Sequence, residues 1–500
     1  MRITQSDIGF VYQSSSFPEY TLMLVGTAFD GPSRIPFHVK KPGEVRRILG
    51  DCPLSDAYQA AHLAGATDII LYRLNGKPAK ALVRYVTDTE NHPIMELTSV
   101  GGSDKYHQIQ LIMYGDHLYV DETQIGGGVR TYYYDRYPTV YDLVYALNQD
   151  AFYGLISFTA KSLDSEFRLQ DLPSDYVLDI PFQGGDSESH LVLDRQADTY
   201  TDEHLMEIKQ YLLEGLFGED PEDQAAFHPV GQLGLLSYGV IALVDMFHDD
   251  GMEFTEILSE FCKQKTLAHN DGCIGVIGTA PPLDESLEDE TFLDTLANQL
   301  LQYTPSRECE YVQVVTGDTY YHIAGRPVSL AYAYAGAQVT LSPHTMMTNK
   351  SLSGVGGLRY KFSKEMIDSL TQKGYICIVP SIRRGYVPYR ATTFTSNSSS
   401  MYAKPHCIRI MQVVTRAISH HLDSLIGSIY ERLSLSDIQE SLEEVLDGFV
   451  GDEILRDYYL LCKLDSASST LHVTLTLVPY SEIESITTSS SIIYPEGMIL

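Results

Sequence analysis

Helical and extended patterns alternate regularly between residues 200 and 345, and this alternation limits the fold more than any other feature of the chain. Apolar residues recur at helical spacing in three stretches, and a short apolar run typical of a buried strand follows each one. The expected order is helix 203–216, strand 239–246, helix 253–267, strand 272–278, helix 288–302 and strand 310–315. Because parallel strands need a crossover connection, usually a helix, this order predicts a mostly parallel sheet covered by helices.

The sequence on either side of this stretch predicts three further parts. Residues 21–76 show two strand patterns, 21–29 and 68–74, separated by helical patterns. Residues 77–190 alternate polar and apolar side chains between glycine-rich turns, which predicts a β-rich unit. After residue 405 the pattern predicts two long helices, the second opening with a capping box at Ser436, and a strand over 470–480. The chain is therefore expected to hold several domains.

Residues 354–395 combine a glycine loop, a helix, a strand and a basic turn. Ser363 is placed to cap the helix, and Gly374 is placed to end it in the left-handed conformation. The run Tyr375–Val379 is typical of a strand, and a turn of two arginines and a glycine follows it. Three arginines, Arg383, Arg384 and Arg390, lie within eight residues in a chain of net charge −31. They are either solvated turn residues or a cluster that meets acidic surface on a neighbouring subunit.

Composition argues against several classes of function. A net charge of −31 repels nucleic acid, so no direct nucleic-acid binding is expected. The seven cysteines form no CxxC pair, which favours reduced intracellular thiols, with intersubunit disulfides in an extracellular particle as the alternative. The longest apolar stretch, 233–247, is too short to span a bilayer, so no membrane insertion is expected. The first residues lack the apolar region of a signal peptide, which predicts folding in the cytoplasm.

The sequence offers no convincing catalytic or cofactor site. The nearest approach to a nucleophile elbow, around Ser237, has the wrong spacing, and neither glycine-rich stretch has the context of a phosphate-binding loop. His420 and His421 are adjacent, so on a helix they point about 100° apart and cannot share a metal ion. The acidic run 284–290 is explained by a helix start and a solvated face, with metal binding as the minor alternative. We therefore expect no catalytic residue, no metal and no cofactor.

Three separate sets of motifs resemble one protein family. The first set, near the start, is Val25-Gly26-Thr27-Ala28, Gly31-Pro32 and Pro42-Gly43-Glu44-Val45. The second set follows the helix at 364–373 and is Gly374-Tyr375-Ile376, Arg384-Gly385-Tyr386-Val387 and Arg390-Ala391-Thr392. The third set, near the end, is Lys463, Asp465, Pro479 and Ile483. On these residues the chain resembles the contractile tail sheath proteins of phages and related contractile injection systems. The resemblance covers about residues 21–76 and 180–485.

The resemblance implies an α/β multidomain fold. Its central, helix-covered, mostly parallel sheet has a subtilisin-like arrangement, and it is joined by a β-rich inserted domain and an α+β C-terminal domain with terminal arms. The implied limits are an N-terminal arm over 1–20, a βαβ part of the core over 21–80, an outward β-rich insertion over 81–190, a central sheath domain over 191–395, a tube-facing domain over 396–480 and a C-terminal arm over 481–500.

The resemblance also implies a structural protein and not an enzyme. Such a subunit polymerises as a helical shell of six-fold stacked rings around an inner tail tube and contracts to drive the tube through the host cell envelope. Its partners are further copies of itself, the inner tail tube protein, and the baseplate and tail terminator proteins. It belongs to the virion tail and is assembled in the host cytoplasm. An acidic α/β enzyme of unassigned chemistry and another helical shell component, of a tube or capsid, are the alternatives.

Two groups of residues are candidate contact sites in such an assembly. Terminal strands that alternate apolar and polar residues can add to a neighbour's sheet edge, and the arginines can pair with its acidic surface. The candidate intersubunit contacts are Ile8, Phe10, Tyr12, Arg383, Arg384, Arg390, Val473, Leu475 and Leu477. The candidate tube contacts are the acidic residues of the last helix, for which a merely solvated face is the alternative: Asp437, Glu440, Glu443, Glu444 and Asp447.

Overall fold

The computed structural model of the chain describes residues 8–10, 17–39, 41–86, 91–99, 110–122, 128–152, 156, 158–173, 177–182, 185–197, 200–251, 253–283, 287, 289–303, 308–321, 325–395, 397, 399–423, 435–465 and 470–480. The chain divides into two compact units, residues 1–416 and 417–500.

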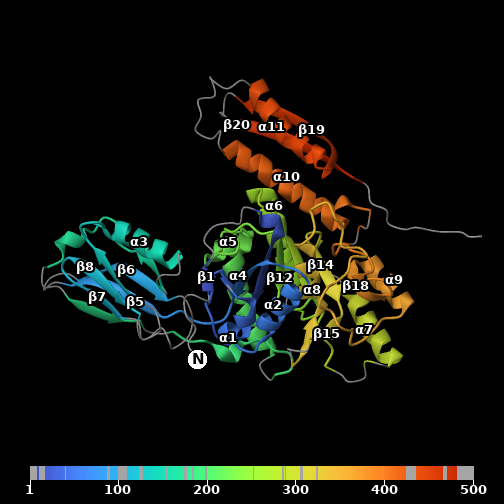
Figure 1. The fold of residues 1–500 in the computed structure, drawn as a ribbon, viewed down its shortest axis with the longest axis horizontal. Coiled ribbons are helices and arrows are strands. Elements are labelled where there is room, and N and C mark those ends of the chain that lie inside the picture. The colour runs from blue at the N-terminus through green and yellow to red at the C-terminus, as the bar shows by residue number, and fades with distance from the viewer. Residues whose placement is uncertain are drawn as a thin grey trace, which may run out of the picture. The chain divides into compact units, whose positions relative to one another are not determined.

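The first unit is built on a large sheet that has nine strands among the described residues (Figure 1). In spatial order the strands are β1 (Ile8–Phe10), β3 (Phe37–Val39), β4 (Asp68–Arg73), β2 (Thr21–Gly26), β12 (Val240–Leu243), β13 (Ile274–Gly278), β14 (Val312–Thr316), β17 (Tyr375–Ser381) and β18 (Gly385–Pro388). The six strands from β4 to β17 run parallel, and β1, β3 and β18 run antiparallel to their neighbours at the two edges. The expectation of a helix-covered, mostly parallel sheet is therefore confirmed.

Helices connect the parallel strands. They are α1 (Val45–Leu49), α2 (Pro53–Leu63), α4 (Asp202–Phe217), α5 (Pro221–Ala226), α6 (Phe254–His269), α7 (Glu290–Gln302), α8 (Leu330–Gln338) and α9 (Lys364–Lys373), and a short hairpin of β15 (Asp318–Tyr320) and β16 (Pro327–Ser329) precedes α8. Helix α9 begins as predicted, because the Ser363 side chain accepts a hydrogen bond from the backbone N–H of Met366. It ends at Gly374, which has the left-handed φ of 104°.

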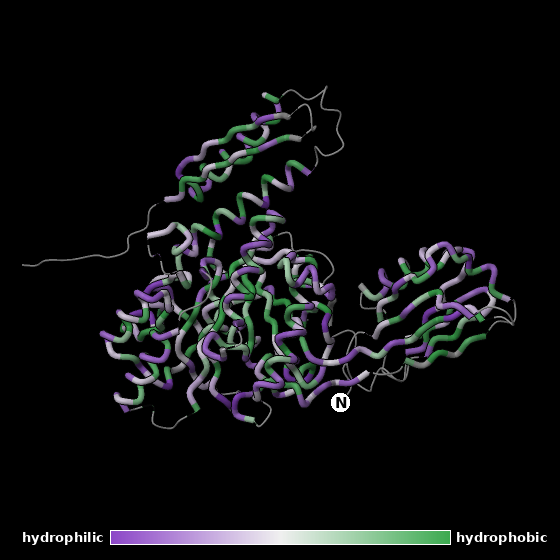
Figure 2. Tube along the Cα trace, turned by 180° about the vertical axis from the view of Figure 1, so that it is seen from behind, coloured by the Kyte–Doolittle hydropathy of each residue, from purple (hydrophilic) through white to green (hydrophobic). Residues whose placement is uncertain are grey.

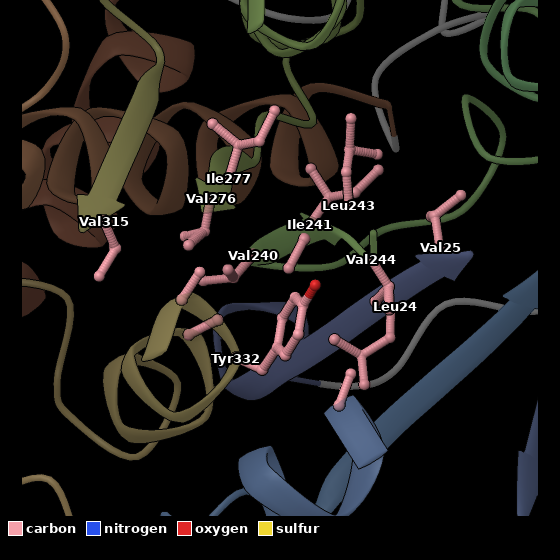
Figure 3. Packing of buried hydrophobic residues seen from close by; sticks show 14 of the residues in the cluster. Leu24, Val25, Val240, Ile241, Leu243, Val244, Val276, Ile277, Val315 and Tyr332 are labelled. Atoms are coloured by element: carbon pink, nitrogen blue, oxygen red, sulfur yellow. The ribbon is translucent and has the colours of Figure 1, made fainter. Parts of the chain in front are cut away.

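The core of the sheet consists of aliphatic side chains that point from the strands toward the helices. Leu24, Val240 and Val276 are fully buried on the face toward α8, where Tyr332 lies, and Ile241 is fully buried on the opposite face (Figure 3). Hydrophobic residues concentrate along these strands, whereas the exposed turns are hydrophilic (Figure 2). Burial of this much apolar surface supplies the main stabilisation of the unit.

Residues 79–182 have a second hydrophobic core of their own. Their strands form two sheets, one of β5 (Lys80–Val86), β6 (Asn91–Ser99) and β10 (Phe158–Ser162), the other of β7 (Gln110–Met113), β8 (His117–Asp121), β9 (Val129–Tyr133) and β11 (Leu178–Pro181). The region is β-rich as predicted, but it also contains a helix that the sequence pattern missed, α3 (Val140–Phe152), which packs on β10. The two ends of the region meet, because Lys77 and Asp186 exchange backbone hydrogen bonds of 2.8 and 2.9 Å.

The last elements are α10 (Pro405–Asp423), α11 (Leu435–Gly451), β19 (Leu455–Asp465) and β20 (Thr470–Pro479). The first turns of α10 belong to the first unit, since Arg409 donates to the carbonyl of Leu341 and Gln412 to that of Cys273. The division between the units consequently lies inside α10, further along the chain than the limit at 396 that the resemblance implied. In the second unit β19 and β20 form an antiparallel hairpin, and α11 packs on β19.

Candidate intersubunit surfaces

The turn between β17 and β18 places two of the three predicted arginines together on the surface. Arg383 and Arg384 are exposed, and the Arg384 guanidinium donates from Nη1 to the carbonyl of Asn349 at 2.6 Å. Between Ser381 and these arginines stands Ile382, whose side chain is fully exposed. Ile382 is not among the contacts predicted from the sequence, although an isoleucine in an otherwise polar turn is a visible signal. The turn therefore presents two positive charges beside one large apolar side chain.

Arg390 is not part of this surface. The pairing of β17 with β18 brings Ser381 opposite Gly385 at the turn, whereas the backbone N–H of Tyr389 bonds to the carbonyl of Cys377 near the other end of the hairpin. At about 3.3 Å per residue, Arg390 lies on the order of 15 Å along the strand from the turn. It is also half-buried and has partners within the chain. The three arginines predicted as one cluster are therefore two separate features.

The predicted N-terminal strand exists, and it has a partner in its own chain. Residues Ile8–Phe10 pair antiparallel with β3, with Ile8 opposite Val39 and Phe10 opposite Phe37. Tyr12 lies outside the described residues. In the single chain this strand completes one edge of the large sheet, so a contact with a neighbour's sheet stays a prediction.

The three candidates on β20 form part of a hairpin within the chain. Their strand pairs with the strand that precedes it in the chain, because Val473, Leu475 and Leu477 lie opposite Cys462, Leu460 and Tyr458 of β19. The face that these residues share is the one covered by α11, since the Tyr458 hydroxyl donates to Asp447 at 2.8 Å. All three β20 side chains are half-buried, so their apolar surface is used inside the unit. The outer backbone edges of both β19 and β20 have no neighbouring strand among the described residues.

The predicted acidic face of α11 is present. Leu442 and Leu446 are fully buried toward the hairpin, and most of the acidic residues lie on the remaining surface of the helix. Asp437, Glu440, Glu444 and Asp447 are exposed, whereas Glu443 is half-buried and accepts a hydrogen bond from Gln439. Glu443 therefore lies at the margin of the acidic stripe.

The carboxyl ends of the parallel strands, where α/β enzymes place their catalytic groups, hold buried polar residues with internal partners. His248, after β12, lies 2.9 Å from the Thr255 hydroxyl and 3.0 Å from the Tyr375 hydroxyl. Burial lowers its pKa to about 3, so the imidazole is neutral. Asp318, after β14, pairs with Arg359 at 2.9 Å, and its burial outweighs that charge and raises its pKa to about 7.

Asp245 is the most perturbed carboxyl group in this region. It follows β12 with a left-handed φ of 54°, and the Tyr332 hydroxyl donates to its Oδ1 at 3.2 Å. Full burial, with a smaller contribution from the charge of Asp194, raises its pKa to about 8. These carboxyl groups and His248 are tied to side chains of the same unit. Across the residues that the structure describes, no three His, Cys, Asp or Glu side chains are arranged to hold a metal ion. None of the helices described is long and apolar enough to cross a bilayer.

Comparison with known proteins extends this description. No protein-family model matches the chain, and no curated protein does. Solved structures do match. A sheath tail protein from Listeria innocua has a TM-score of 0.50 and 13% sequence identity, over 92% of this chain and 91% of the Listeria chain. This chain has the fold of a sheath tail protein.

Other sheath structures are similar at lower scores. A sheath tail protein from Desulfitobacterium hafniense matches 94% of this chain and 100% of its own, with a TM-score of 0.45 and 11% identity. The contracted helical sheath of the anti-feeding prophage matches 55% of this chain and 75% of its own, with a TM-score of 0.39 and 13% identity. The match to the Listeria protein confirms, at the level of fold, the resemblance seen in the sequence motifs. The subtilisin-like arrangement of the central sheet stays a prediction.

Proposed function

We propose that this chain is the structural subunit of a contractile tail sheath. It polymerises as a helical shell of six-fold stacked rings around an inner tail tube and contracts to drive the tube through the host cell envelope. The observation that carries this proposal is the sheath tail fold, shared with the Listeria protein over 92% of this chain. The proposed location is the virion tail, after assembly in the host cytoplasm. The proposed partners at the two ends of the shell are the baseplate and tail terminator proteins.

Strand addition is the proposed link between subunits. The backbone edge of β20 has no neighbouring strand among the described residues, and main-chain hydrogen bonds to an added strand do not depend on the side chains of β20. An added strand must bind through the backbone because the side chains of Val473, Leu475 and Leu477 already pack within the unit, on the face covered by α11 and opposite residues of β19. The N-terminal strand around Ile8 and Phe10 is a suitable donor, since it is short and lies at a sheet edge of its own chain.

The proposed contact with the tube is the acidic face of α11. Its exposed carboxylates form one stripe, and a basic surface on the tube protein would complement them. Because the two leucines opposite this stripe already bury the apolar side of α11, the stripe is available without unfolding the unit. Contraction then requires two packings of the same subunit that differ in the surface buried between copies.

Electron microscopy of the purified full-length chain tests the proposal. Long, hollow, striated polymers are expected. Discrete globular oligomers under all assembly conditions would contradict it and favour the alternative of an acidic enzyme.

Removal of residues 1–16 tests the strand link. The cut stops ahead of Pro18, which is buried and begins the helical turn before β2. We expect polymers to be lost, while the circular dichroism spectrum and the melting temperature stay close to those of the full chain. Polymers of normal length from this variant would rule out the N-terminal strand as the link.

A further inference from the structure

Positive charge is concentrated in one stretch of this acidic chain. Residues 341–416 contain eleven Lys and Arg but only two acidic residues, Glu365 and Asp368, in a chain with 35 Lys and Arg against 66 Asp and Glu. Eight of the eleven lie between residues 350 and 390, the part of the stretch that contains α9, β17 and β18 at one edge of the large sheet. Charge that is segregated on a surface attracts an oppositely charged partner from a distance and orients it before contact.

Five exposed cations form what we call the basic end: Lys350, Lys361, Lys364, Arg383 and Arg384. Lys350 and Arg384 belong to segments that touch, because Ser351 donates its hydroxyl to the carbonyl of Arg384 at 2.8 Å. Lys364 opens α9, which packs on β17. Among the described residues none of the five forms an ion pair, and the exposed Ile382 shares the β17–β18 turn with Arg383 and Arg384. Exposed cations around an apolar side chain are typical of a binding surface for an acidic partner.

The opposite end of the same sheet is acidic. Residues 202–223, which include α4, the start of α5 and the link between them, contain eight Asp and Glu against a single lysine, Lys209. The exposed members, which we call the acidic end, extend along the whole of α4, a length on the order of 25 Å, from its first residues to the start of α5: Asp202, Glu203, Glu219, Asp220 and Glu222. Met206, on the same helix, is an exposed apolar residue. Lys209 is already paired with Glu253 at 3.5 Å. Within the described part of the chain, cations of other segments face only its later part, where Arg34 pairs with Glu214 at 3.4 Å and Lys77, Lys80 and Lys161 line a cavity together with Glu219.

The two ends are separated by the width of the sheet. Helix α4 lies against β4, because a Cβ added at Gly215 would stand 3.1 Å from the ring of Tyr72. Strands β2, β12, β13 and β14 lie between β4 and β17. At about 4.8 Å per strand the ends are on the order of 25 Å apart. Both belong to the first unit, and Figure 1 shows α4 and α5 on one side of β12 and α9 and β18 on the other.

We propose that the basic end of one copy binds the acidic end of another copy, head to tail. This inference rests on the proposed sheath function and names one of its contacts. Two basic ends or two acidic ends repel each other, so a symmetric pair is disfavoured. A contact between different surfaces does not close on itself and continues into a filament. In a polymer, the acidic end of the neighbouring copy is present at a high local concentration, so a second copy is the acidic partner.

Charge reversal in the full-length chain tests the contact. One variant carries Lys350→Glu, Arg383→Glu and Arg384→Glu and has two acidic ends. The other carries Glu203→Lys, Glu219→Lys and Glu222→Lys and has two basic ends. We expect each variant alone to need about tenfold more protein to assemble at low salt, measured by light scattering and sedimentation. An equimolar mixture of the two, and a chain with all six substitutions, should assemble again.

The matched control reverses Lys41, Arg136 and Arg168, which are exposed elsewhere in the first unit, and changes the net charge by the same amount. It should assemble like the unaltered chain. Normal assembly of either reversed variant alone, equal loss in the control, or a mixture that does not recover would each overturn the proposal. If these results hold but the unaltered chain forms small oligomers without a hollow shell, the contact stands and the sheath function fails. If hollow shells form regardless of the reversals, the sheath function stands and this contact fails.

Ile382 gives a second readout that does not depend on charge. Ile382→Ser should weaken assembly without changing its dependence on salt, because only apolar surface is lost. Leu283→Ser, at an exposed apolar residue elsewhere in the first unit, should leave assembly unchanged. Equal behaviour of the two serine variants would exclude Ile382 from the contact.

Discussion

Asp271 is the centre of a partly buried ion network whose loss should destabilise the first unit strongly. Its carboxylate accepts from Lys265 Nζ at 3.0 Å, from the Ser237 hydroxyl at 2.6 Å and from Arg416 Nε at 2.8 Å. The Lys265 side chain is fully buried, with the carbonyl of Gly234 as its other partner at 2.9 Å. The network therefore joins α6 through Lys265, the segment before β12 through Ser237, and the part of α10 that belongs to the first unit through Arg416.

The expected effect of Asp271→Asn follows from the charge left behind. Because the ammonium of Lys265 would stay buried without an anion, we expect a loss of about 3 kcal/mol in the free energy of unfolding. Lys265→Met with Asp271→Asn removes both charges, so the double variant should lose less than the sum of the single losses, with a coupling of about 1–3 kcal/mol. Urea titration followed by far-UV circular dichroism measures this, since the chain has no tryptophan to report by fluorescence.

The pH dependence of the same variant has a definite sign. Burial by itself raises the pKa of Asp271, but Lys265 and Arg416 outweigh burial and hold the pKa below its ordinary value. A carboxyl group with a depressed native pKa stabilises the fold above its unfolded pKa of about 3.9 and loses this contribution as the pH falls through the native pKa. The penalty of Asp271→Asn should therefore be full at pH 7 and shrink below about pH 4. Glu253→Gln, at an exposed ion pair, should cost no more than about 0.5 kcal/mol. Strict additivity in the double variant, or a penalty that grows on acidification, would refute this reasoning.

Three further outcomes are expected. Excision of residues 79–184, with the flanking ends rejoined by a short glycine linker, should leave a soluble chain that still polymerises, because the region has its own core and its ends already meet; an insoluble product would contradict this. Reversal of Glu440, Glu443 and Glu444 to Lys should weaken co-assembly with the tube protein and leave tube-free polymers intact; normal co-assembly at low and moderate salt would show that α11 is not the tube contact. Asp245→Asn should raise stability at pH 8 and leave it unchanged near pH 4. A carboxyl group with a raised native pKa, here about 8, favours folding below its unfolded pKa and loses that contribution as the pH rises; equal stability gains at both pH values, measured by thermal melting, would contradict it.

Elements with strong local signals were predictable from the sequence. Ser363 and Gly374 define the two ends of α9 through a cap and a left-handed residue, both of which act within a single turn. The parallel strands β12, β13 and β14 were visible because strands buried on both faces are short continuous apolar runs. Helix α8 was missed for the opposite reason. All nine of its residues are buried, so its sequence has no polar face and no helical period.

The candidate contact sites were less predictable, because they depend on which surfaces the fold leaves exposed. The alternation along β20 correctly indicates a strand, but it does not say that α11 covers the apolar face that includes Leu475. Arg383 and Arg390 are close in sequence, yet the β17–β18 hairpin holds them at opposite ends. Ile382 becomes a candidate only once the turn is known to be exposed. In each case the missing information is tertiary.

In the proposed assembly, the two kinds of contact differ in how much movement they tolerate. A backbone hydrogen bond in a sheet needs a donor–acceptor distance of about 2.7–3.2 Å and a nearly fixed direction. Two paired strands from neighbouring subunits must therefore move together, or their hydrogen bonds break. Attraction between charged surfaces acts over a screening length of about 8 Å at physiological ionic strength and has no preferred direction. The basic and acidic ends are therefore suited to slide and re-pair when bodies rotate, whereas β20 and an added strand are suited to keep neighbours joined. A subunit with both kinds of contact can have two packings without releasing its neighbours, which is the physical requirement for a shell that contracts as one body.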